Sequence, residues 1–121
     1  MPRRKKAANP ERIHVSQFKI MWNVVAFDLP MNDRKERRAY AQFHKFLKRD
    51  GYFMMQESVY ARPCPNADNL ETHKKRLLRN LPPYGQVRIL AFTDAQFGKM
   101  EVYYGRVKGE PEKPPDQLTL F

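Results

Sequence analysis

The chain has 121 residues and a formal net charge of +10, from 23 lysines and arginines against 13 acidic residues. This length fits one domain, and the positive charge indicates a polyanionic partner, for which nucleic acid is a better candidate than a membrane surface. No run of about 18 apolar residues exists to span a membrane, and a single cysteine excludes an internal disulfide and a paired-cysteine zinc site. We therefore expect a cytoplasmic protein.

Residues 1–20 are expected to form a basic, flexible arm. They are dense in charge and poor in apolar periodicity, and the start Arg3-Arg4-Lys5-Lys6 is not followed by the apolar stretch of a signal peptide. Such an arm either becomes ordered on a phosphate backbone or serves only as a solubilising tail, and the sequence leaves both interpretations open.

The first strand and the first helix follow the arm. The apolar run at residues 21–27 predicts a central strand that ends at the turn signal Asp28-Leu29-Pro30. Residues 32–50 predict a helix that starts with an acidic variant of the capping box and ends before Gly51. Its outer arc is almost uniformly positive, where an ordinary surface helix mixes signs, so we expect phosphate contacts. These basic residues are Arg34, Arg37, Arg38, Lys45, Lys48 and Arg49.

The second half of the chain predicts three further strands and a second helix. Aromatic and β-branched residues favour one long strand at 52–62, and the helix at 66–80 adds further basic residues for nucleic-acid binding. Strands are expected at 87–92 and 101–107, separated by a single helical turn that ends at Phe97. The basic residues of this second helix are Lys74, Lys75, Arg76 and Arg79.

We interpret this succession as the order strand, helix, strand, strand, helix, strand. It predicts an α+β domain at residues 21–107 with the ferredoxin-like βαββαβ fold, a four-stranded antiparallel sheet with both helices on one face. The segments 24–27 and 89–92 are apolar on both faces, so the second face of the sheet needs a cover. The simplest cover is the same face of a second copy, and the alternative is that the arm or the tail folds back.

Residues 108–121 are read as a Pro-rich linker followed by a short tail. The final residues, 117–121, alternate in hydrophobicity after a stiff spacer. This pattern favours an added strand that pairs with an edge of another subunit or a partner protein, and plain disorder is the alternative.

Asp28 is the most informative polar residue because it ends a buried strand. Two copies of it could approach each other in a face-to-face dimer and bind Mg²⁺ or Mn²⁺ through carboxylate oxygens. The alternative is that Asp28 caps its own turn. No other acid is placed to share an ion, and Cys64, between two prolines, has no evident base that would make it a nucleophile.

Several motifs in order resemble the CRISPR-associated adaptation protein family Cas-two (Cas2). They span about residues 21–107. The motifs are Val24-Val25-Ala26-Phe27-Asp28-Leu29-Pro30, Glu36-Arg37-Arg38-Ala39-Tyr40, Asp50-Gly51-Tyr52-Phe53, Gln56-Glu57-Ser58-Val59-Tyr60-Ala61-Arg62, Leu81-Pro82-Pro83-Tyr84-Gly85 and Phe92-Thr93-Asp94-Ala95-Gln96-Phe97.

The resemblance implies a ferredoxin-like homodimer that joins the Cas-one integrase and holds double-stranded prespacer DNA during CRISPR spacer acquisition. It also implies metal-dependent endonuclease activity on RNA or DNA, with Asp28 as the Mg²⁺ site and catalytic residue. We favour the adaptor role, because basic residues are plentiful whereas the catalytic constellation reduces to one acid per chain. A third interpretation is an RNA-acting dimer related to toxins or antitoxins, since small ferredoxin-like dimers host several functions.

Overall fold

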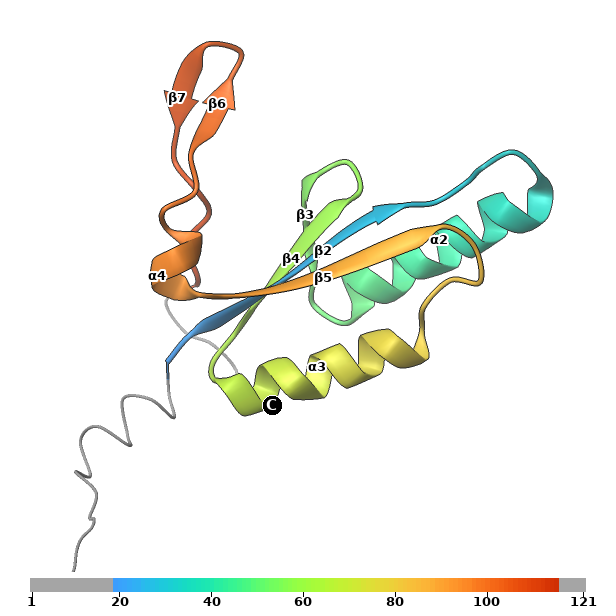
Figure 1. Ribbon diagram of the computed structural model, residues 1–121, viewed down its shortest axis with the longest axis horizontal. Helices are drawn as coiled ribbons and strands as arrows, with labels where there is room; N and C mark the ends of the chain where they lie inside the picture. Colours follow the sequence, from blue (N-terminus) through green and yellow to red (C-terminus); the bar gives the residue numbers. More distant parts are fainter. Residues whose placement is uncertain (1–18, 116–121) are drawn as a thin grey trace, which may run out of the picture.

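The computed structural model describes residues 19–115, which form a four-stranded antiparallel sheet with two long helices on one face (Figure 1). The sheet order β3-β4-β2-β5 places β2 inside the sheet, as predicted, and the predicted ferredoxin-like α+β fold is confirmed. The elements of this fold are β2 (Met21–Asp28), α2 (Arg34–Arg49), β3 (Phe53–Gln56), β4 (Val59–Cys64), α3 (Ala67–Arg79) and β5 (Gln86–Thr93).

Two of the predicted strands are wrong in extent or place. The single strand expected at 52–62 is a hairpin of β3 and β4, because the chain reverses at Ser58, whose φ of 68° lies in the left-handed region. The strand at 87–92 is therefore the fourth strand of the fold rather than the third. The order strand, helix, strand, strand, helix, strand arises from this hairpin, since the elements predicted from the sequence placed only one strand between the two helices.

The strand expected at 101–107 does not join the sheet. It forms a separate hairpin of β6 (Val102–Tyr104) and β7 (Val107–Gly109), which projects away from the sheet beyond the short helix α4 (Asp94–Phe97) (Figure 1). Gly105 has a φ of 65° and turns the chain at the tip, so a run that reads as one strand becomes two.

The main core lies between the sheet and the two long helices. Val25 and Phe27 of β2 pack with Phe43 and Leu47 of α2 and with Leu77 of α3. Helix α2 begins as its sequence predicts, since the Asp33 carboxylate accepts a hydrogen bond from the Glu36 backbone N–H at 2.8 Å. This core fixes both helices on one face and leaves their basic arcs outside.

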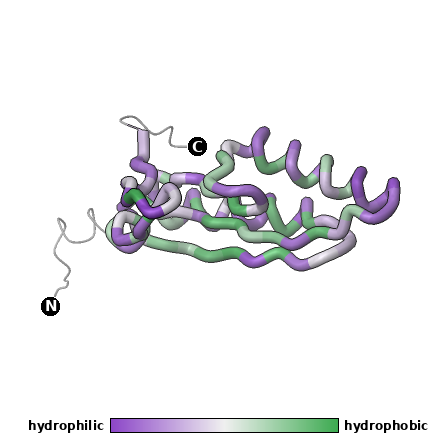
Figure 2. The backbone as a smooth tube through the Cα atoms, turned by 90° about the horizontal axis from the view of Figure 1, so that it is seen from above, coloured by the Kyte–Doolittle hydropathy of each residue, from purple (hydrophilic) through white to green (hydrophobic). Residues whose placement is uncertain are grey.

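The second face of the sheet is covered only at one end. There Trp22 stacks on Phe97 of α4 with ring centroids 4.0 Å apart, and its indole N–H donates to Asp94 at 2.8 Å. Away from α4, Leu90 is 40% exposed on this face. Figure 2 shows that the strands of the sheet include apolar stretches. The predicted need for a cover is therefore met only in part by the described chain.

Several expectations concern residues that the structure does not describe. All but the last two residues of the basic arm predicted at 1–20 lie outside the described range, and so does the added strand at 117–121. Within residues 19–115, no helix combines the length and the hydrophobicity that crossing a membrane requires.

Candidate nucleic-acid interface and metal site

Helix α2 carries exposed basic side chains toward both of its ends. Its six predicted basic residues are all exposed, and none forms an ion pair with another residue in the range 19–115. Lys35, which the sequence reasoning passed over, is exposed on the same helix. Arg37 donates a long hydrogen bond to the Met31 carbonyl oxygen at 3.4 Å, and the other basic side chains of α2 make none within residues 19–115. Cations with so few internal contacts are suited to phosphate contacts.

The basic residues of α3 are held differently. Arg76 pairs with Asp50 at 3.1 Å, and Lys74 pairs with Glu71 at 3.8 Å. Lys75 and Arg79 are exposed and unpaired among the described residues. The second predicted basic group therefore separates into residues tied into the fold and residues free to meet a ligand.

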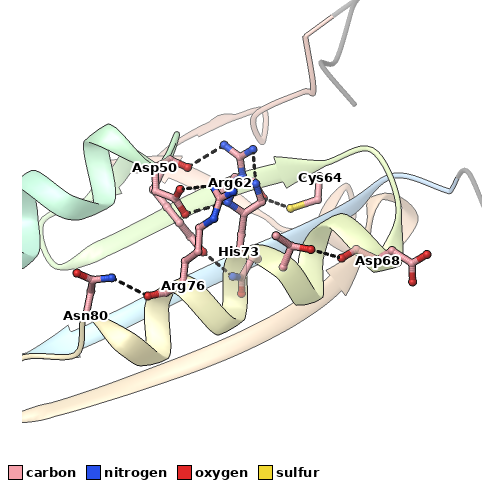
Figure 3. Close-up of polar contacts among 10 residues, drawn as sticks. Asp50, Arg62, Cys64, Asp68, His73, Arg76 and Asn80 are labelled. Atoms are coloured by element: carbon pink, nitrogen blue, oxygen red, sulfur yellow. Dashed lines mark hydrogen bonds and ion pairs between the residues drawn. The ribbon is translucent and has the colours of Figure 1, made fainter. Parts of the chain in front are cut away.

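A buried polar network joins α3 to the end of α2 and to β4 (Figure 3). His73, only 3% exposed, donates from Nδ1 to the Asp50 carboxylate at 2.8 Å, and Arg62 donates to His73 Nε2 at 2.8 Å. A guanidinium group only donates, so Nε2 is the acceptor in this arrangement and Nδ1 is the atom that donates to Asp50.

The chain has adapted locally to this network. Arg62 also donates to the Asp50 carbonyl oxygen at 2.8 Å, and a side chain at Gly51 would overlap the Arg62 guanidinium. Gly51 has a φ of 89°, which also favours glycine. Sequence reasoning missed the network because its members come from three different elements.

Asp28 lies at the exposed end of β2. Strand alternation places it on the same face as Trp22, Val24 and Ala26, which is the partly uncovered face. Among the described residues, the side chains that bond backbone N–H groups near this turn are those of Asp33 and Glu36 rather than Asp28. Within the described residues, the Asp28 side chain therefore does not cap its own turn in the way that the alternative interpretation expected.

The surroundings of Asp28 fit half of a metal site. Magnesium is commonly bound through one or two carboxylates with water and phosphate oxygens, so one exposed carboxylate per chain fits a site that two chains complete. Within residues 19–115, no group of three or more His, Cys, Asp and Glu residues lies close enough together to hold an ion. Within the described residues Asp28 is a single carboxylate, so the predicted metal role needs ligands from outside this chain.

Arg88 is a further charged residue on this face. It is exposed on β5, where it pairs with Ala26 of β2. This pair lies two residues along the strands from the pair of Asp28 and Gln86, so both pairs are on the same face. The sequence did carry a signal, because a charged residue between Val87 and Ile89 must point to the opposite face. Arg88 therefore places a cation on the same face of the sheet as the Asp28 carboxylate.

Residues 21–100 match the family model described as CRISPR associated protein Cas2. The chain belongs to the Cas2 family. A relative from Flavobacterium psychrophilum is 43% identical over 107 residues, covering 88% of this chain and 93% of the relative. A relative from Parvibaculum lavamentivorans is 46% identical over 101 residues, covering 84% of this chain and all of the relative, at 100%.

A third Cas2 relative, from Acidovorax ebreus, is 46% identical over 99 residues, covering 81% of this chain and 97% of its own length. All three are named CRISPR-associated endoribonuclease Cas2. The match to the Cas2 model includes the sheet, both long helices and α4, whereas the β6–β7 hairpin lies beyond it. Family membership therefore rests on the elements that carry the candidate sites.

Proposed function

We propose that this Cas2-family chain is a homodimeric adaptor of CRISPR spacer acquisition, which binds double-stranded prespacer DNA together with the Cas-one integrase. The observation that carries the proposal is the exposed, unpaired positive face of α2. Contacts of that kind are made to phosphates, so binding is strong at low salt and nearly independent of sequence.

The homodimer is supported by the second face of the sheet. This face carries Trp22, Val24, Leu90 and Phe92, and α4 covers only part of it. The same face of a second copy covers the remainder without further sequence, as an interface with two-fold symmetry. The two symmetric α2 surfaces would then extend the positive footprint, and the role of the integrase partner rests on the Cas2 resemblance.

Binding to short DNA duplexes of unrelated sequence, measured by fluorescence anisotropy over a series of salt concentrations, tests the adaptor proposal. We expect similar affinities for all sequences and a steep fall with salt, with log K decreasing by about 0.9 per log unit of salt for each phosphate contacted. A salt-independent affinity, or one confined to a single sequence, would contradict the proposal.

A second candidate function is metal-dependent cleavage of nucleic acid, favoured by the name endoribonuclease that the relatives carry. In this candidate, Asp28 of each copy would contribute a carboxylate to hold Mg²⁺ or Mn²⁺, and Arg88 would orient the phosphate. A bound ion of this kind activates water and neutralises phosphate charge. The exposure of Asp28 on the uncovered face supports this pairing.

Binding and cleavage assays side by side separate the two candidates. The wild type and Asp28→Asn are compared on DNA duplexes and on RNA, with Mg²⁺ or with EDTA, and Asp68→Asn serves as a control because it removes an exposed acid elsewhere. Mg²⁺-dependent cleavage that only Asp28→Asn abolishes establishes the nuclease. Salt-sensitive duplex binding without cleavage in any variant establishes the adaptor alone.

A further inference from the structure

A groove of about 380 Å³ lies between α2 and the loop that follows α3. Two prolines, Pro82 and Pro83, prevent α3 from continuing and turn the chain back toward the sheet. Gly85, with a φ of 81°, then brings the loop against the end of β2, where any side chain would overlap the Asp28 carbonyl oxygen. The loop is therefore fixed, and the groove beside it is part of the fold.

The lining of the groove combines an apolar floor with a positive rim. Phe43, Phe46, Leu81 and the two prolines form the floor, and no acidic residue lines it among the described residues. Lys45 and Arg49 stand four residues apart on α2, so both lie on the rim. This combination favours a ligand that has a negative group beside a flat apolar one.

Two amide side chains complete the lining. Gln42 lies on α2 between the floor and the cations, and Asn80 lies opposite, at the end of α3. Asn80 donates to the Arg76 carbonyl oxygen at 2.8 Å, which fixes its side chain at the groove. Amides in these places can hydrogen-bond the edge of a nucleobase while its face rests on the apolar floor.

We propose that this groove is a subsite for one unpaired nucleotide of a bound nucleic-acid strand. Lys45 and Arg49 hold its phosphate, and Phe46, Leu81 and Pro82 receive its base. The volume lies within the range of about 300–1,000 Å³ that is typical of small-ligand sites. The inference rests on the proposed nucleic-acid binding by α2 and adds a preference for strands with an extrahelical base.

The structure supplies matched controls for both kinds of contact. Leu81 lines the groove and is 42% exposed, whereas Leu78 is 50% exposed and does not line it. Lys45 lines the groove, whereas Lys48 is exposed on the same helix outside it. All four residues are exposed, so none of these substitutions removes a core side chain.

The test uses a short DNA duplex with a single bulged 2-aminopurine and the same duplex without the bulge. We expect the wild type to bind the bulged duplex about tenfold more tightly, from stacking of one base. Leu81→Ser should lose this preference and Leu78→Ser should keep it. Lys45→Glu and Lys48→Glu should both weaken binding of both duplexes, but only Lys45→Glu should lose the preference.

The fluorescence of 2-aminopurine gives a second readout, since a base that enters the groove changes its stacking. We expect an emission change with the wild type and Leu78→Ser that is absent with Leu81→Ser. Equal affinity of the wild type for the two duplexes, or a preference that survives Leu81→Ser and Lys45→Glu, would overturn the subsite while leaving the adaptor proposal intact. Failure to bind either duplex would overturn both.

Discussion

Helices α2 and α3 cover the same face of the sheet and are both rich in lysine and arginine (Figure 1). In α2 these residues are exposed and unpaired within the described chain, whereas in α3 Arg76 and the buried His73 are bonded to Asp50. The difference shows that the number of charges on a helix does not determine its role, and that the partner of each charge does. Under the adaptor proposal, α2 meets the nucleic acid, whereas the bonds of Arg76 and His73 tie α3 into the fold.

Asp50→Ala should have the largest effect of the substitutions considered, because it removes the bonds that distinguish α3 from α2. The substitution leaves His73 without its acceptor and removes the partner of Arg76, so we expect the free energy of unfolding to fall by about 3 kcal/mol. Urea denaturation measures the loss, and Glu57→Ala, which removes an exposed acid from a turn, should change stability little. A loss below about 1 kcal/mol for Asp50→Ala would show that the network contributes little to holding α3.

Cys64, at the end of β4 beside this network, tests whether the α3 side of the sheet is closed. Burial raises the pKa of its thiol to about 11 from the usual 9.0. At pH 8 the thiolate fraction should therefore be about 100-fold lower in the folded protein, and reaction with a disulfide reagent should be slowed at least that much relative to protein in urea. Equal rates in the two states would contradict a closed α3 side.

The same pKa shift has a consequence for stability. The folded chain keeps a proton on Cys64 that the unfolded chain releases between pH about 9 and about 11, so this contribution to stability is present below that window and is lost as pH rises through it. Cys64→Ala should therefore lose less stability than the wild type across the same pH window.

Double charge reversals with the same residue spacing on α2 and on α3 compare how much each helix contributes to DNA binding. Arg34→Glu plus Arg38→Glu on α2 should weaken duplex affinity about 30-fold at moderate salt. The slope of log K against log salt concentration should fall by the amount expected for about two lost phosphate contacts. Lys75→Glu plus Arg79→Glu, with the same spacing on α3, should cost less than about threefold. Equal losses for the two pairs would place both helices in the footprint, as the sequence alone suggests.

Arg76→Ala should have the smallest effect on stability. The Arg76 side chain is 49% exposed, so solvent screens its ion pair with Asp50, and we expect a loss below about 1 kcal/mol. Thermal unfolding at low and high salt measures it. A large, salt-independent loss would show instead that Arg76 belongs to the buried part of the network.

The sequence predicts the fold best where the signal is local. Residues close together in the sequence determine the apolar run of β2 and the helix cap formed by Asp33 and Glu36. The structure contains both features. The reversal at Ser58 is not predicted, because Glu57-Ser58 lacks the glycine, proline or asparagine that usually marks a turn. In the β6–β7 hairpin, one glycine within an aromatic run was too weak a signal to divide it.

The candidate site is predictable only in part, for the same reason. Helical periodicity places the cations of α2 outside, and the strand end places Asp28 at an edge. By contrast, His73 meets Asp50 across 23 residues of sequence and Arg62 across 11, so only the packed fold brings them together. The groove beside α2 likewise depends on how the loop after α3 returns to the sheet.

Gly85 connects two features that otherwise lie on opposite faces of the sheet. The loop that forms one wall of the groove is seated, at this glycine, directly against the backbone of Asp28 and Leu29. The end of β2 and the groove wall therefore depend on the same close approach at one residue without a side chain. A larger residue at position 85 would disturb both candidate sites at once, although the two lie on different faces of the sheet.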